Sequence, residues 1–167
     1  NMVDDAFNVP GSKNINHQLA HPEIYDYIDV SQLNSRLQDE MHWKKIKWIS
    51  DQARSKGFLL HMTKLYGSDE RPEGPWKGWK PGDTDNAIEE WWRSLLAGVA
   101  GVRFHRPTAG IGLSNKSKSC IMATRKVENK VRFWEVAPRQ ELLSDRQEDE
   151  AYLAANPGKA YMLYFTQ

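Results

Sequence analysis

Polar residues able to do chemistry come where short apolar runs of this sequence end. Asp29 lies late in one run, Lys64 and Tyr66 follow a second, and His105 and Arg106 end a third. A carboxylate can act as acid, base or nucleophile, and an imidazole titrates near neutral pH. A guanidinium offers a rigid fork of donors to a carboxylate or to sugar hydroxyls. These residue types predict a polar site assembled at the ends of strands.

Further polar residues follow Asp29 closely. Ser31, Gln32 and Asn34 stand just beyond it, where their hydroxyl and amide groups can hydrogen-bond to a ligand. We take Asp29 as the candidate catalytic carboxylate, and Ser31, Gln32, Asn34, Lys64, Tyr66, His105 and Arg106 as candidate substrate-binding residues. Asp29 has an alternative role, because a buried carboxylate is usually paired and can simply fix the end of its strand.

The basic residues also have structural alternatives. Lys64 can reach solvent or an acidic partner rather than act as an amine of lowered pKa. Arg103 or Arg106 can pair with the acidic segment 69–73. The sequence leaves these roles open.

Three short runs predict the strands that carry these residues. Residues 26–31 and 58–63 are rich in β-branched, aromatic and aliphatic side chains, and residues 101–105 alternate apolar with charged. Pro107 ends the third run because it has no N–H to donate. The carboxyl ends of these strands would face whatever the protein binds.

Helical patterns separate and follow the strands. Apolar residues recur near helical spacing in segments 38–54, 84–99 and 114–130. Ser114 is a suitable N-cap, and Gly57 a suitable C-cap. Strands that alternate with helices predict an α/β fold with a parallel sheet. Residues 1–21 have the composition of a loop.

The pattern changes near Pro138. Two short runs, 150–155 and 160–166, flank the turn sequence Asn-Pro-Gly-Lys and predict a hairpin outside the α/β layer. We therefore expect one unit over residues 1–137 and the start of a second over 138–167.

Composition excludes several function classes. With 23 basic and 22 acidic residues the formal net charge is +1, and no basic stripe interleaved with aromatics suggests nucleic acid. No apolar run approaches the roughly 18 residues of a membrane span. Cys120 is the single cysteine, so no intrachain disulfide forms, and its helical position favours a buried thiol. The histidines lack paired metal-ligand spacing and the glycines lack a phosphate-binding signature, so we expect no metal and no cofactor.

Tryptophan is abundant, with seven residues in the chain. Trp76 and Trp79 lie in the long polar segment 67–83, where burial in a helix–sheet core is less available to them. Flat indole faces stack on sugar rings, which makes both candidate substrate-binding residues. Packing in the protein remains the alternative.

Four segments of the sequence, taken in order, resemble one family of bacterial proteins. That family has an apiosidase-like (β/α)-barrel followed by a β-sandwich that carries the name collagen-binding domain. The resemblance covers nearly the whole chain and rests on the strings IYDYIDVSQLN, LHMTKLYG, EEWWRSLLAGVAGVRFHRPTAGIGLS and LLSDRQEDEAYLAANPGKAYMLYFT. It implies a partial (β/α)8 TIM barrel, its last three βα units, followed by the first hairpin of the sandwich.

The resemblance also implies a chemistry. Barrel relatives with an assigned activity are glycoside hydrolases, which use two carboxyl groups at strand ends. In such barrels the proton donor commonly lies on the fourth strand, which would precede Asn1. The second carboxylate often ends the seventh strand, where this sequence has Lys64 and Tyr66 instead. The segment alone should therefore be inactive.

Three hypotheses follow. The first is a carbohydrate-active barrel protein that acts on or binds an oligosaccharide or polysaccharide, completed by the missing barrel half or another chain. The second is a carbohydrate- or protein-binding scaffold that has lost its carboxylate pair, and the third is an intact small α/β domain. For the barrel segment we expect a secreted or periplasmic location, and association through exposed strand edges.

Overall fold

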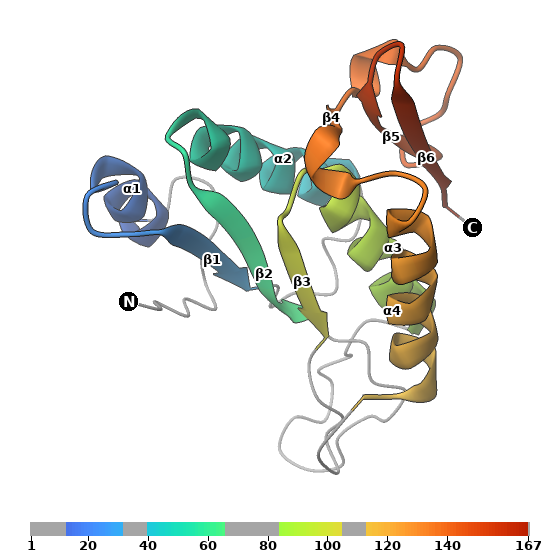
Figure 1. Cartoon of the computed structure of the whole chain (residues 1–167), viewed down its shortest axis with the longest axis horizontal. Coiled ribbons are helices and arrows are strands. Elements are labelled where there is room, and N and C mark those ends of the chain that lie inside the picture. Colours follow the sequence, from blue (N-terminus) through green and yellow to red (C-terminus); the bar gives the residue numbers. More distant parts are fainter. Residues whose placement is uncertain (1–12, 32–39, 66–83, 105–112, 167) are drawn as a thin grey trace.

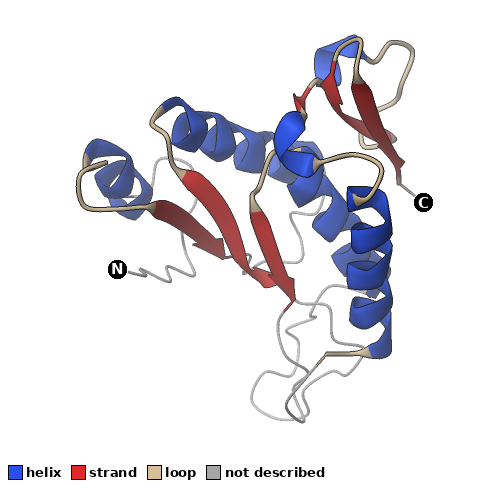
Figure 2. Cartoon of the chain, in the orientation of Figure 1, coloured by secondary structure: helices blue, strands red, loops and turns tan. Residues whose placement is uncertain are grey.

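The computed structural model describes residues 13–31, 40–65, 84–104 and 113–166, which form a mixed α/β structure (Figure 1). A parallel sheet with helices precedes a smaller antiparallel sheet (Figure 2). The helices are α1 (Lys13–Ala20), α2 (Glu40–Ser55), α3 (Thr84–Leu96) and α4 (Asn115–Glu128). The strands are β1 (Tyr27–Ser31), β2 (Leu59–Leu65), β3 (Gly101–Phe104), β4 (Ala137–Pro138), β5 (Ala151–Asn156) and β6 (Ala160–Phe165).

The first sheet has the strand order β1, β2, β3, with all pairs parallel. Helix α2 connects the first two strands and α3 the next two, while α4 follows β3. This confirms the predicted alternation of strands and helices and the α/β class. Parallel neighbours require such crossover connections, which place helices against the sheet.

Local signals set the ends of two helices as predicted. The Ser114 hydroxyl caps α4 by accepting a hydrogen bond from the backbone N–H of Ser117 at 3.1 Å. After α2, Gly57 adopts a φ of 78°, a left-handed conformation that glycine enters without steric cost. The chain can therefore leave α2 and turn directly into β2.

One face of the first sheet packs against the helices. Ile28, Val30, Leu60 and Met62 are almost fully buried in the hydrophobic core. Phe104 joins them by stacking on Trp91 of α3, with ring centroids 4.4 Å apart. Because strand side chains alternate between faces, the residues between these project from the other face.

The second sheet has the order β4, β5, β6 and is antiparallel. Strands β5 and β6 form the predicted hairpin, with Gly158 in its turn at a φ of 79°. Two short 3-10 helices, Phe133–Glu135 and Gln140–Leu142, lie in the connection from α4. Tyr152 and Met162 join the same hydrophobic core as the first sheet.

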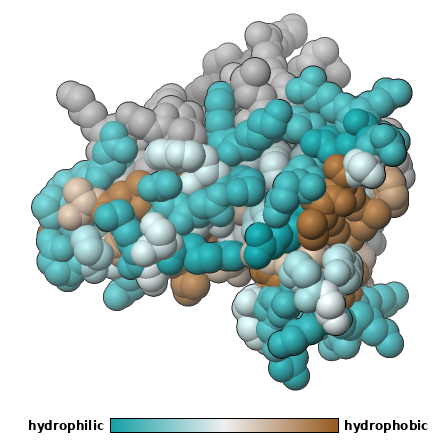
Figure 3. Space-filling model, turned by 90° about the horizontal axis from the view of Figure 1, so that it is seen from above, coloured by the Kyte–Doolittle hydropathy of each residue, from teal (hydrophilic) through white to brown (hydrophobic). Residues whose placement is uncertain are grey.

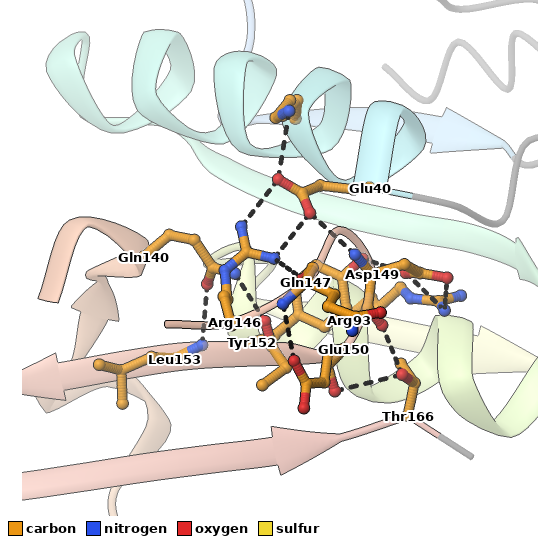
Figure 4. Close-up of polar contacts among 12 residues, drawn as sticks. Glu40, Arg93, Gln140, Arg146, Gln147, Asp149, Glu150, Tyr152, Leu153 and Thr166 are labelled. Atoms are coloured by element: carbon orange, nitrogen blue, oxygen red, sulfur yellow. Dashed lines mark hydrogen bonds and ion pairs between the residues drawn. The ribbon is translucent and has the colours of Figure 1, made fainter. Parts of the chain in front are cut away.

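A polar network ties the second sheet to the helices (Figure 4). The Arg146 guanidinium donates two hydrogen bonds to the Glu40 carboxylate at the start of α2, at 2.7 and 2.8 Å. The Asp149 N–H donates to the same carboxylate at 3.0 Å. Arg93 of α3 is buried and donates to Asp149, which also accepts from the Tyr152 hydroxyl. Paired and hydrogen-bonded charges of this kind hold the hairpin in place.

One sequence prediction is wrong in part. Residues 13–20 form α1 rather than loop, because Gln18 and Leu19 bury one side of this short polar segment. Tertiary burial here outweighs low intrinsic helix propensity. In the described part of the chain, no helix has the length and apolar character needed to cross a membrane.

Candidate functional site

The candidate site lies on the face of the first sheet that points away from the buried apolar side chains. Strand pairing aligns Asp29 of β1 with His61 of β2, and His61 with Gly101 of β3. Arg103 lies two residues beyond Gly101 and therefore projects from the same face. A carboxylate, an imidazole and a guanidinium thus come from three neighbouring strands.

Asp29 and His61 form a hydrogen-bonded pair across the first two strands. The distance from Asp29 Oδ1 to His61 Nδ1 is 3.2 Å. The Asp29 side chain is only 2% exposed, whereas that of His61 is 41% exposed. The pair therefore joins a buried acceptor to a side chain that a ligand can reach.

Gly101 makes room for the imidazole. A Cβ atom at this position would lie 2.7 Å from His61 Cδ2 and 3.2 Å from His61 Nε2. The ring is therefore seated against the backbone of β3, and any larger residue would push it away. The sequence places glycine at the strand position where the neighbouring side chain needs the space.

A bulge in β2 shapes the next part of the face. The register shifts after Met62, so that Ser31 pairs with Lys64 rather than with Thr63. The Thr63 hydroxyl donates to the Val30 carbonyl at 3.1 Å. Bulges of this kind redirect side chains and are common beside functional sites.

Arg103 is held by the bulge but remains exposed. Its Nε donates to the Thr63 carbonyl at 3.1 Å, which fixes the stem of the guanidinium. The terminal nitrogens of an arginine so held keep four further N–H donors. Arg103 and His61 together can hydrogen-bond to a polar ligand that carries several hydroxyl or carboxyl oxygens.

The structure places some of the predicted residues and leaves others aside. Asp29 is the middle residue of β1 rather than its last, and its side chain contacts His61 on the neighbouring strand β2. The backbones of Ser31 and Lys64 pair in the next row, while their side chains are outside the described part. The remaining candidates, Gln32, Asn34, Tyr66, Trp76, Trp79, His105 and Arg106, lie outside the described residues and stay predictions.

Sequence reasoning missed two residues of this face. The sequence patterns test His61, like the other histidines, only for metal-ligand spacing, and they indicate for Arg103 only a structural ion pair. The signal for His61 was its place in a run whose other members are mostly apolar, LLHMTKL. Its pairing with Asp29 depends on strand register, which two isolated runs do not specify.

Other chemically reactive groups are less suited to a site. Burial raises the pKa of the Cys120 thiol to about 12, so the thiol is protonated and inert at neutral pH. A polar pocket beside Glu40 and Arg146 includes these two residues in its lining, and both are already engaged in holding the second sheet. Among the described residues, no three His, Cys, Asp or Glu side chains lie together as a metal site.

Comparison with known proteins leaves the site to be judged on its geometry. No family model, no curated protein and no solved structure matches this chain. The polar sheet face is therefore the feature from which a function has to be argued. Its groups can hydrogen-bond to hydroxyl-rich ligands.

Proposed function

We propose that this chain is part of a carbohydrate-active (β/α)-barrel protein and that the polar face of the first sheet binds a saccharide. The observation that carries the proposal is the set of Asp29, His61 and Arg103 on the face opposite the helix-packed core. Sugars present many hydroxyls close together, and charged donors and acceptors on a rigid sheet can match them.

The topology supports the barrel part of the proposal. Three parallel strands lie in sequential order and each is followed by a helix, which is the repeating unit of a (β/α) barrel. In a closed barrel the face away from the helices points inward. Asp29, His61 and Arg103 would then point into the barrel, with Arg103 nearest the carboxyl ends of the strands, where sites of this fold are built.

Binding is better supported than cleavage for the described part of the chain. Within strands β1 to β3, Asp29 is the one carboxylate, and it is already hydrogen-bonded to His61. Glycoside hydrolysis requires two carboxyl groups placed on either side of the scissile bond. Cleavage would therefore need a carboxylic acid from another part of the protein or from another chain.

A glycan array tests this proposal. We expect wild-type protein to bind at least one plant or bacterial oligosaccharide, and Arg103→Gln to weaken that binding about tenfold, because a charge-assisted hydrogen bond is lost. The matched control is Arg125→Gln, since Arg125 is exposed on α4 and pairs only with nearby Glu128 among the described contacts. The control should bind like wild type.

Two results would count against the proposal. Wild-type protein that is folded by circular dichroism and binds no oligosaccharide on the array would reject saccharide binding. Equal loss in Arg103→Gln and Arg125→Gln would show binding to general surface charge rather than to the polar sheet face.

A further inference from the structure

We infer that Asp29 is a positioning residue that holds His61 in the Nδ1-protonated tautomer and so presents Nε2 as an acceptor for a ligand hydroxyl. The ligand part of this inference rests on the saccharide site proposed above. The tautomer part stands on the structure of the pair alone. It assigns Asp29 a role different from that of a catalytic carboxylate.

The hydrogen bond sets the tautomer. When Asp29 is ionised its carboxylate can only accept, so the 3.2 Å contact between Asp29 Oδ1 and His61 Nδ1 then places a proton on Nδ1. In a neutral imidazole the other nitrogen then carries a lone pair. A free histidine prefers the opposite tautomer, with the proton on Nε2, so the protein imposes this choice.

Burial makes the contact specific. Asp29 is 2% exposed, and water does not replace His61 as its partner as easily as at the surface. Gly101 supports the same ring from the third strand, because a Cβ there would overlap His61 Cδ2 at 2.7 Å. The His61 ring is therefore held between the Asp29 carboxylate and the backbone of Gly101, which leaves the ring little freedom to turn.

The exposure of His61 indicates what this arrangement serves. A histidine that only joined two strands could be buried with its partner, but 41% of this side chain is exposed. Nδ1 is used by Asp29, so Nε2 is the ring nitrogen left for a ligand. The same division of roles orients histidines at metal and catalytic sites, where one nitrogen is fixed and the other acts.

The chain contains a matched pair for comparison. His21 Nδ1 lies 3.0 Å from Glu23 Oε1, but both side chains are well exposed, at 41% and 65%. Water competes for both groups there, so this contact should hold its tautomer only weakly. Glu23→Gln therefore controls for the removal of a carboxylate beside a histidine.

The first experiment measures the tautomers by long-range proton–nitrogen NMR on the whole chain at mildly alkaline pH, where imidazoles are neutral. We expect wild-type His61 to show the Nδ1–H pattern, and Asp29→Ala to move it toward Nε2–H. Gly101→Ala keeps both partners but displaces the ring, and we expect the same shift. Glu23→Gln should leave the His61 signals unchanged.

The second experiment measures binding on the glycan array with two replacements of His61. The amide of glutamine can reach the place of Nε2, whereas that of asparagine lies near Nδ1. We expect His61→Asn to lower binding about tenfold and His61→Gln to retain more of it. Asp29→Ala should also weaken binding, while Glu23→Gln should not.

The outcomes separate the inference from the proposed function. A wild-type His61 in the Nε2–H tautomer overturns the inference, whether or not glycans bind and whether or not the variants fold. The expected tautomer without any bound glycan supports the positioning role of Asp29 but rejects the saccharide site. Glycan binding that His61→Asn and His61→Gln leave unchanged rejects Nε2 as the contact and leaves the proposed function standing.

Discussion

Buried and exposed carboxylates have different consequences in this molecule. Asp29 and Glu40 are both buried, and each accepts hydrogen bonds from residues far away in sequence. Glu23 and Asp51 are exposed and pair with residues two or four positions away. The buried carboxylates therefore determine tertiary structure, whereas the exposed pairs contribute little.

Glu40 is an ionic anchor of the second sheet. Its pKa is lowered from 4.5 to about 2, first by the hydrogen bonds from Arg146 and then by those from Asp149 and Lys44, against the opposing effect of burial. A lowered pKa in the folded state stabilises the fold above the unfolded value and loses that effect as the pH falls from 4.5 toward 2. The linked free energy is on the order of 3 kcal/mol.

Glu40→Gln tests this link between the lowered pKa of Glu40 and the free energy of unfolding. We expect the free energy of unfolding at pH 7 to fall by about 2 to 3 kcal/mol, because the Arg146 guanidinium loses its anionic partner. The loss of stability between pH 4.5 and 2 should also become shallower than in wild type. Denaturant titrations at a series of pH values measure both effects.

The control is Asp51→Asn on the same helix, which removes an exposed pair with Lys47. It should change the unfolding free energy by less than about 0.5 kcal/mol. If the two variants behave alike, the network in Figure 4 does not anchor the second sheet.

At the scale of elements, much of the fold is predictable from the sequence. Short apolar or alternating runs predict β1 to β3 and the final hairpin, and apolar spacing together with Ser114 predicts α2 to α4. These signals are local and repeat over several residues, so they can be recognised in a single sequence. Helix α1 has no such signal, because its side chains become buried only through contacts with the rest of the fold.

Register is the part that the sequence does not reveal. The bulge after Met62 brings Lys64 opposite Ser31, and nothing in the run LLHMTKL marks where the extra residue lies. The pairing of Asp29 with His61 depends on the same register. The sequence therefore predicts the strands that carry Asp29, His61 and Arg103, but it does not predict the hydrogen bond between Asp29 and His61.

The turn between α3 and β3 has no room for a side chain at Gly98. Gly98 has a φ of 89°, and a Cβ there would lie 2.8 Å from Ser50 Oγ and 2.9 Å from an Arg54 nitrogen. Gly98→Ala should lower the free energy of unfolding by about 3 kcal/mol, since backbone strain and overlap with α2 add together. Denaturant unfolding measures the change.

Gly158 provides the comparison, because its φ is 79° and a Cβ there meets nothing within 4 Å. Gly158→Ala should lose only the conformational part, about 1 kcal/mol. If Gly98→Ala and Gly158→Ala lowered the free energy of unfolding equally, contact with α2 would not restrict the turn at Gly98.

Across the whole molecule, the second sheet has apolar side chains on both faces. Tyr152 and Met162 face the shared core, while Tyr161, Leu163 and Phe165 of β6 are exposed at 56%, 45% and 61%. Figure 3 views the molecule from above and shows hydrophobic surface, in brown, at its right side. In Figure 1 this is the side on which α4 and β6 lie. In the described chain, no strand pairs with the outer edge of β6.

This surface predicts association of the isolated chain, as the exposed strand edges already suggested. Light scattering over a range of concentrations should show an apparent mass that rises with concentration, because apolar faces and free edges attract other copies. The double variant Leu163→Lys and Phe165→Lys should lower that mass toward the monomer.

Met122→Lys is the control, since Met122 is 63% exposed but lies on α4 rather than on β6. It should associate like wild type. A wild-type chain that stays monomeric at every concentration would show that the exposed face of β6 does not drive association.

The central claim is that the polar face of the first sheet binds a saccharide. The most direct test is an NMR titration with the oligosaccharide that gives the strongest array signal, following backbone amides along the strands. We predict the largest shift changes at Asp29, His61 and Arg103, and small changes in β5 and β6. Changes confined to the second sheet, with none at those three residues, would contradict the account.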